Sequence, residues 1–232
     1  MNIYINNRNL LTWPRSMAEK LKSEGHQVTF VDNNSTYEPL RDWYLESGFR
    51  VLYLKENEGH TAPWNHYGRE MNDDYYVVTD PDLDISNVPS DWDALLTEAV
   101  RLTGASKCGL SLDDSRIPST NPAWLDDMFY RYPKGGNPQS WGPVLRKGPV
   151  TLYDRQVDTT FAVYKPGTRY HVGGIRAGRP YTARHLPWHV VPELTGDDRA
   201  FEITLDDEFR FYLEHANDSS TTAQRFRLAG IQ

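Results

Sequence analysis

Three aspartates at alternate positions, Asp80, Asp82 and Asp84, follow an aromatic and β-branched run at residues 75–79. Such a run is typical of a buried strand, and Pro81 should end it, so the carboxylates are expected at the carboxyl end of the strand. Carboxylates at this spacing repel one another unless a cation lies among them, and Asp oxygens suit Mg²⁺ or Mn²⁺. We therefore interpret Asp80 and Asp82 as metal-site residues, with Asp84 in reserve. A solvated acidic turn that caps the next helix explains the same spacing.

The residues before this run alternate between strand and helix patterns. Helices are predicted from Pro14 to the stop at Gly25 and over residues 37–47, and strands over residues 3–5, 27–32 and 50–54. This alternation favours a parallel sheet with crossover helices. Ligands bind such sheets beyond the carboxyl ends of their strands, where Asp80 and Asp82 would lie.

The later residues are less regular. A capping box formed by Ser90 and Asp93 predicts a helix that runs to Gly104. Residues 173–192 are rich in Gly, Arg and Pro and predict a long lid or binding loop. The other expected elements are strands at 107–112 and 159–164 and helices at 123–130 and 204–215.

The composition of the 232 residues indicates a single folded globular domain in an aqueous environment. The formal charge of -7 makes nucleic acid a poor candidate partner, because phosphate binding depends largely on Lys and Arg. No apolar run is long enough to span a bilayer, although peripheral membrane contact stays open, as does the oligomeric state. Cys108 is the only cysteine, which excludes an intrachain disulfide and fits a cytoplasmic location without a signal peptide.

Six short motifs follow one another along the chain, at residues 31–35, 57–59, 63–65, 80–82, 158–162 and 183–188. In this order and spacing they resemble those of nucleotide-sugar-dependent glycosyltransferases of the GT-A fold, particularly small family 2-like members. The resemblance covers most of the chain and is strongest over residues 1–85 and again at the last two motifs. It implies one Rossmann-like α/β domain with a mostly parallel central sheet flanked by helices. Residues 1–112 would bind the nucleotide-sugar, and residues 113–232 would supply the acceptor-binding half and a C-terminal loop.

The resemblance implies a metal-dependent transferase that moves a sugar from a nucleotide-sugar, with a UDP-sugar expected, to a glycan or other hydroxyl acceptor. Asn6 and Arg8 would lie near the donor, and Asp32 would accept hydrogen bonds from its base or ribose. Asn65 would orient the nucleotide or the acidic loop. Turn formation by Asp32 and a helix start at Asn65 are the structural alternatives.

For the metal, the resemblance implies that Asp82 ligates a Mn²⁺ or Mg²⁺ ion that bridges the two phosphates. Asp80 would contact the ribose or a metal-bound water. Family members commonly add a ligand from the C-terminal loop, for which His185 is the best match and His189 the second. Pro187 between them disfavours the shared helical face of a zinc motif. An ordinary surface or core histidine is the alternative for each.

Three arginines of the expected loop, Arg176, Arg179 and Arg184, could fold over the donor, because guanidinium groups bind diphosphate oxygens in pairs of contacts. Arg184 is the preferred donor-binding residue of the three. Solvated charges on a mobile loop are the alternative.

Sugar transfer with inversion needs a carboxylate base near the acceptor hydroxyl. Asp158 is the candidate, followed by Asp154 and Asp114. The Glu-Asp pair of many family 2 members has no clear counterpart in this sequence, so retention stays open. The alternative for Asp158 is a strand-end acid that bonds nearby amides. Sugars could stack on Trp124, Trp141 or Trp188, although such aromatics are more often core residues.

Two other functions remain open. A sugar-phosphate nucleotidyltransferase would need a Gly-rich N-terminal loop, and residues 6–9 contain no glycine. A non-catalytic nucleotide- or glycan-binding module could keep the shape of the site without its chemistry.

Overall fold

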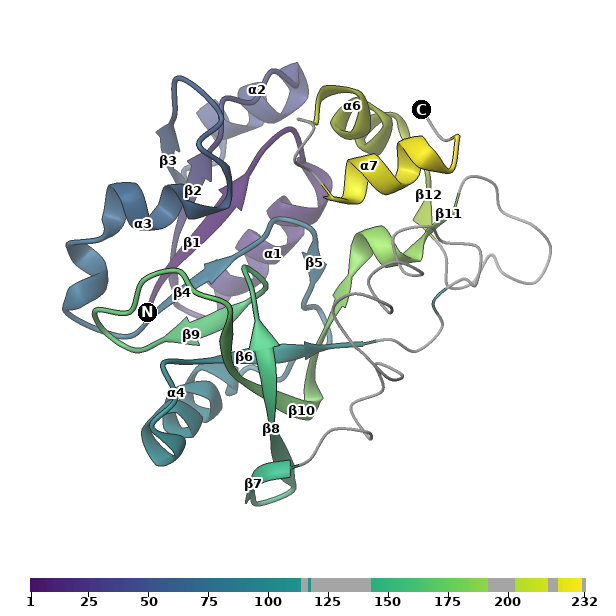
Figure 1. Cartoon of the computed structure of the whole chain (residues 1–232). Coiled ribbons are helices and arrows are strands. Elements are labelled where there is room, and N and C mark those ends of the chain that lie inside the picture. Colours follow the sequence, from purple (N-terminus) through teal and green to yellow (C-terminus); the bar gives the residue numbers. More distant parts are fainter. Residues whose placement is uncertain (114–116, 118–142, 192–202, 217–220, 231–232) are drawn as a thin grey trace.

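The computed structural model describes residues 1–113, 117, 143–191, 203–216 and 221–230. Within them, ten strands form one sheet, with the order β3-β2-β1-β4-β9-β6-β10-β8-β7 and with β5 paired to β10 (Figure 1). The strands are β1 Asn2–Asn7, β2 Gln27–Asp32, β3 Arg50–Tyr53, β4 Tyr76–Thr79, β5 Leu83–Asp84, β6 Lys107–Leu112, β7 Pro143–Lys147, β8 Val150–Val157, β9 Ala162–Tyr164 and β10 Gly173–His185. Strands β11 Val190–Val191 and β12 Ile203–Thr204 form a separate pair.

Helices flank this sheet. They are α1 Thr12–Ser23, α2 Glu38–Glu46, α3 Ala62–Tyr67, α4 Trp92–Thr103, α6 Asp207–His215 and α7 Thr221–Leu228, with 3-10 turns η1 Gly59–Thr61, η2 Glu70–Asn72 and η4 Leu186–His189. None of the helices in the described ranges is long and apolar enough to cross a bilayer.

Most strands of the sheet point the same way. Strands β3, β2, β1 and β4 are parallel neighbours, and β6 is parallel to β10. Strand β9 runs antiparallel to both β4 and β6, and β8 runs antiparallel to β10. The predicted α/β class, with a mostly parallel sheet flanked by helices, is confirmed.

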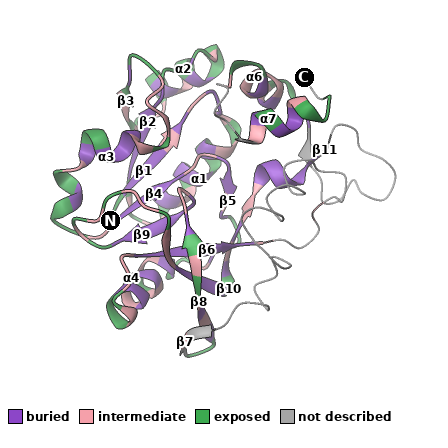
Figure 2. Cartoon of the chain, viewed as in Figure 1, coloured by how far each residue is buried: buried purple, intermediate pink, exposed green. Residues whose placement is uncertain are grey.

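The central strands are buried on both faces, as Figure 2 shows. On β1, Ile3 and Ile5 belong to the core beneath α1 and α4, whereas Tyr4 between them belongs to the core beneath α3. Strand β4 repeats this division with Val77 and Tyr76. Because side chains alternate along a strand, burial on both sides needs consecutive apolar residues, which explains the continuous run that marked β4 in the sequence.

As expected from Pro81, strand β4 does not continue through the acidic run. Strand β4 ends at Thr79, and after Pro81 the chain forms the short strand β5. Strand β5 pairs antiparallel with the end of β10, so that Asp84 lies opposite Arg184. The link that carries Asp80 and Asp82 therefore lies between two different sheet pairings.

The prediction of a loop over residues 173–192 is wrong for most of that range, because residues Gly173–His185 form strand β10. Strand β10 fills the space between β6 and β8, with Ile175 and Ala177 in the core. Glycine serves close packing here, because a Cβ at Gly174 would meet the Lys107 side chain at 2.8 Å. Pro180 lies where the β10 register shifts, between Ala177 and Thr182, so it does not break the pairing.

Two helix predictions also need correction. No side-chain capping hydrogen bond forms at the start of α4 within the described residues, and Asp91, rather than Ser90, occupies the N-cap position. The helix predicted from residue 204 is α6, which begins at Asp207. The Asp206 side chain accepts a hydrogen bond from the Phe209 amide and fixes the first turn there. Helix α7 follows and was not predicted. The helix expected at 123–130 lies outside the described residues.

Candidate functional site

Asp80 is held at the end of β4 by the segment between β8 and β9. The Asp80 amide donates to the Thr159 carbonyl at 3.1 Å, and the Thr159 hydroxyl donates to Asp80 Oδ2 at 2.8 Å. The same segment packs against Gly109 of β6, where a Cβ would meet the Phe161 carbonyl at 3.2 Å. The position of the Asp80 carboxylate therefore depends on Thr159.

The charge around Asp80 is strongly negative. Burial, followed by the nearby carboxylates of Asp82 and Asp158, raises the pKa of Asp80 to about 7. The Thr159 hydrogen bond and His185 act in the opposite direction. A divalent cation would relieve this crowding, because it stabilises the ionised form of every carboxylate that faces it.

Asp82 and His185 face each other across the β5–β10 pairing. Asp82 Oδ2 lies 3.6 Å from His185 Nε2, and the Asp82 carbonyl accepts the Leu186 amide at 2.9 Å. Asp82 is largely buried, and the His185 ring packs edge-on against Trp188. The structure thus brings together two metal-site candidates, Asp82 and His185, that lie far apart in the sequence.

Asp158 lies beside the same cluster but has different partners. Its Oδ1 accepts the Thr160 amide at 3.2 Å and lies 3.8 Å from an Arg176 guanidinium nitrogen. Asp158 follows β8 and precedes β9, so the prediction that it heads a strand is wrong by three residues. The runner-up Asp154 is exposed on β8, and Asp114 lies outside the described residues.

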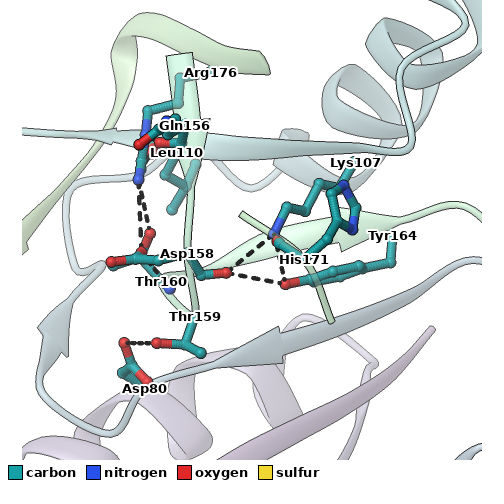
Figure 3. A network of polar contacts seen from close by, with 10 residues as sticks. All are labelled: Asp80, Lys107, Leu110, Gln156, Asp158, Thr159, Thr160, Tyr164, His171 and Arg176. Carbon is teal, nitrogen blue, oxygen red and sulfur yellow. Dashed lines mark hydrogen bonds and ion pairs between the residues drawn. The ribbon is translucent and has the colours of Figure 1, made fainter. Parts of the chain in front are cut away.

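Two buried cations contact residues 156–160, as Figure 3 shows. The Lys107 ammonium donates to the Asp158 carbonyl at 3.1 Å, to the His171 carbonyl at 2.6 Å and to the Tyr164 hydroxyl at 3.4 Å. Arg176 donates to the carbonyls of Leu110 and Gln156 and to the Thr160 hydroxyl. Arg176 was predicted to lie on a loop that folds over the donor, which is wrong because Arg176 belongs to strand β10 and its side chain is only 2% exposed.

The burial of Lys107 predicts a pH dependence of stability. Burial lowers the pKa of Lys107 to about 8, so the folded protein loses this proton before the unfolded chain does. Between about pH 8 and 10 the unfolded chain binds more protons, and the free energy of unfolding should rise by up to roughly 1.4 kcal/mol per pH unit from this group. Denaturant titrations of wild type and Lys107→Met at pH 7.5 and 9.5 measure the difference.

The exposed lysine Lys165 provides the matched control. Lys165→Met should follow the wild-type pH dependence, whereas Lys107→Met should lose the rise. Identical pH dependence in all three proteins would contradict the burial of a charged Lys107.

The expected donor residues lie at the ends of β1 and β2. The Asn6 side chain donates to the Gly59 carbonyl at 3.2 Å and accepts from the side chain of Asn33. The side-chain oxygen Oδ1 of Asn33 accepts the Glu58 amide at 3.0 Å. Asp32 is buried and accepts the Ser35 amide at 2.9 Å. Because β1 pairs in parallel with both β2 and β4, the ends of these strands lie at the same edge as Asp80.

Burial raises the pKa of Asp32, and hydrogen bonds from Ser35 and Tyr44 partly offset this rise. A buried carboxylate at this edge suits a ligand that donates a hydrogen bond. The turn that Asp32 forms with Ser35 was its predicted structural alternative, and the structure contains that turn.

The remaining donor candidates are dispersed. Arg8 follows β1 and is partly buried, and its Nε has no hydrogen-bond partner within the described residues. Asn65 is exposed on α3, where it donates to Glu58 at 3.4 Å. It is therefore connected to the Asn6–Asn33 group through Glu58 but does not reach Asp80 in any described contact.

Arg184 lies on the side of β10 opposite to His185. It is 3.7 Å from Asp84 and lines a cavity of about 390 Å³ between α1 and β5, together with Trp13 and Lys20. Adjacent residues of a strand point to opposite faces, so the sequence neighbours Arg184 and His185 serve different surroundings. Arg179 is exposed and lies 3.0 Å from Asp113, so the expected cluster of three arginines does not form.

The other aromatic and histidine candidates belong mainly to the core. Trp188 is buried among core residues, and Trp124 and Trp141 lie outside the described residues. Burial lowers the pKa of His189 to about 4, and neither ring nitrogen has a hydrogen-bond partner in the described part of the chain. Of the two histidine candidates, His185 is therefore the one that lies within 4 Å of Asp82.

These residues suit a cation that is shared with a ligand. Among the described residues, no group of three or more His, Cys, Asp or Glu side chains could hold a metal by itself. Mg²⁺ commonly binds through one or two carboxylates and completes its shell with phosphate oxygens and water. Asp82, with its carboxylate 3.6 Å from His185 and Asp80 nearby, fits that kind of site.

Sequence reasoning missed three residues that organise the site: Thr159, Asn33 and Lys107. Thr159 and Asn33 were noted only as members of their motifs. Lys107 was treated as a strand residue, although a lysine that begins the buried strand β6 is itself unusual. That signal could have marked Lys107 in advance.

No family model matches this chain, and no curated protein matches it. Among solved structures, it is similar to a mannosyltransferase from Pyrobaculum calidifontis in complex with GDP-Man and Mn²⁺, with 13% sequence identity and a TM-score of 0.42. The match covers 71% of this chain and 44% of that one, so the chain spans less than half of that protein's length. A likeness of this size does not establish a common family.

Proposed function

We propose that this chain is a metal-dependent glycosyltransferase that moves a sugar from a nucleotide-sugar to a hydroxyl acceptor with inversion. The observation that supports it best is the convergence of Asp80, Asp82, Asp158 and His185 at one edge of the sheet. Parallel α/β sheets bind ligands beyond the carboxyl ends of their strands, which is where β4 delivers the two aspartates. UDP-sugars are the first donors to test.

In this proposal residues 1–112 supply the donor half. Asp32, Asn6 and Arg8 would hold the nucleoside at the ends of β1 and β2. Asp82 and His185 would hold Mn²⁺ or Mg²⁺ together with the diphosphate, and Asp80 would contact the ribose or a metal-bound water. When bound, the metal neutralises charge on the departing diphosphate. Asn65 and Arg184 would act only at the margins of the donor.

Residues 113–232 supply the acceptor half, with Asp158 as the base. Its Oδ1 accepts the Thr160 amide, and the carboxylate would take the proton of an acceptor hydroxyl. A carboxylate must lie within hydrogen-bond reach of that hydroxyl to act as the base. The glycan or other hydroxyl acceptor would then attack the sugar carbon on the face opposite to the leaving diphosphate.

A thermal-shift screen of nucleotide-sugars tests donor binding. A ligand that binds only the folded state raises Tm, so a donor at about 100 times its Kd should stabilise the protein by roughly 2.7 kcal/mol. The rise should require Mn²⁺ or Mg²⁺ and disappear with EDTA. Nucleoside diphosphate release, measured with the same donors, tests turnover.

Two outcomes would favour other functions. Pyrophosphate production from a nucleoside triphosphate and a sugar phosphate would identify a nucleotidyltransferase. Metal-dependent donor binding without any turnover across donors and acceptors would favour a non-catalytic binding module.

A further inference from the structure

A single short segment positions two of the carboxylates in the proposed site. Residues 158–160 carry the Asp158 side chain, and Thr159 bonds both the amide and the carboxylate of Asp80. A displacement of this segment would therefore move the candidate base and the start of the acidic link together. Whatever fixes the segment fixes the distance between Asp158 and Asp80.

Lys107 holds the centre of the segment through the Asp158 carbonyl. Its side chain is fully buried, and the three hydrogen-bond acceptors of its ammonium are two carbonyls and the Tyr164 hydroxyl. A buried ammonium is costly unless its donors are bonded, and removing it would leave the Asp158 and His171 carbonyls without this donor. Lys107 and the segment therefore depend on each other.

Arg176 holds both flanks of the segment. Its guanidinium reaches the Gln156 carbonyl at 2.9 Å before Asp158 and the Thr160 hydroxyl at 3.0 Å after it, while Nη1 donates to Leu110 at 2.6 Å. The planar fork of arginine can bond acceptors in several directions at once, which a lysine cannot do. Lys107 and Arg176 come from β6 and β10, the parallel pair beside β9.

The backbone of both strands is shaped for these contacts. A Cβ at Gly174, whose φ is +110°, would meet Lys107 Cγ at 2.8 Å and the Lys107 carbonyl at 2.9 Å. A Cβ at Gly109 would meet Val157 at 3.0 Å and the Phe161 carbonyl at 3.2 Å. Glycine at both positions lets the lysine and the crossing segment pack at these distances.

We propose that Lys107 and Arg176 are positioning residues of the transfer site: they hold residues 158–160 so that the Asp158 carboxylate and the Asp80 carboxylate keep a fixed separation. This inference rests on the proposed function for its catalytic meaning, although the positioning itself can be measured without any turnover.

Amide hydrogen exchange at neutral pH tests the positioning directly. In Lys107→Met and in Thr160→Val, the Asp80 and Thr160 amides should exchange about tenfold faster or more, because local opening of the segment becomes easier. Thr160→Val removes the hydroxyl that Arg176 bonds and keeps the side-chain shape. Thr160→Ser keeps the hydroxyl, so its amides should stay close to wild type.

Leu40→Ala is the matched control for general destabilisation, since Leu40 is fully buried on helix α2, which makes no described hydrogen bond to residues 158–160. In Leu40→Ala, exchange of the Asp80 and Thr160 amides should not accelerate more than exchange of the other amides of the sheet. Unchanged exchange in both Lys107→Met and Thr160→Val, or equal acceleration in Leu40→Ala, overturns the inference.

Kinetics supply the second measurement. A misplaced base lowers kcat, so Lys107→Met and Thr160→Val should lose about 10- to 100-fold in kcat with little change in donor KM, and Thr160→Ser should restore kcat. A rise in donor KM with unchanged kcat would count against positioning. If wild type transfers no sugar from any donor, the proposed function fails, and the exchange comparison still decides whether these residues hold the segment.

Discussion

Replacing Asp82 by alanine should reduce kcat/KM for sugar transfer by at least about 10³-fold, because a metal-held diphosphate is worth several kcal/mol in the transition state. The same change should abolish the metal-dependent part of donor binding. Asp82 is the carboxylate that lies 3.6 Å from His185, beside the β5–β10 pairing. Assays of nucleoside diphosphate release measure the loss of transfer. Calorimetric titration of Mn²⁺ in the presence of UDP measures the loss of metal-dependent binding.

Asp84→Ala provides the matched control. Asp84 is two residues further along the same acidic run but faces Arg184 on the other side of the strand pair. It should keep donor binding and transfer within a few-fold of wild type. Equal losses in Asp82→Ala and Asp84→Ala would mean that the run acts only through its total charge, and the proposed metal site would be wrong.

Replacing Asp158 by asparagine should leave metal and donor binding intact and reduce kcat by about 10²- to 10⁴-fold, the usual contribution of a general base. Asparagine keeps the volume of the side chain and an oxygen that can accept the Thr160 amide, so the segment should stay in place. It cannot take a proton from an acceptor hydroxyl. Thermal shift with donor and Mn²⁺, together with steady-state transfer rates, separates binding from chemistry.

The exposed residue Asp154 of β8 serves as the comparison. Asp154→Asn should transfer sugar at the wild-type rate. Normal transfer by Asp158→Asn would instead place the base elsewhere or indicate retention of configuration, and loss of transfer in Asp154→Asn would make that residue the base.

Local patterns in the sequence were sufficient for the first half of the fold. The stop signal at Gly25 ends α1 within two residues, and the apolar run at 27–32 coincides with β2. These elements are specified by residues close in the chain, and their order of strand and helix implies parallel pairing through crossover helices. The Asp80 and Asp82 assignment as strand-end carboxylates follows from the same kind of local signal.

The second half was less predictable because its strands depend on distant partners. The Gly and Arg content of β10 indicated a loop, yet the strand forms because it lies between β6 and β8. Ordering a glycine in a strand costs more conformational entropy than ordering another residue. At Gly174 the packing of the Lys107 side chain, which lies where a Cβ would be, helps to offset this cost. A local pattern cannot report that neighbour.

The sequence by itself determined the α/β class, the strands at the N-terminal half and the acidic link that follows β4. Only the tertiary structure decided which residues join that link. His185 lies beside Asp82 whereas Arg184 lies beside Asp84, because adjacent residues of β10 point to opposite faces once its register with β5 is set. Likewise, Asp158 and Lys107 meet because β9 inserts between β4 and β6, a pairing between residues far apart in the chain that no local spacing encodes.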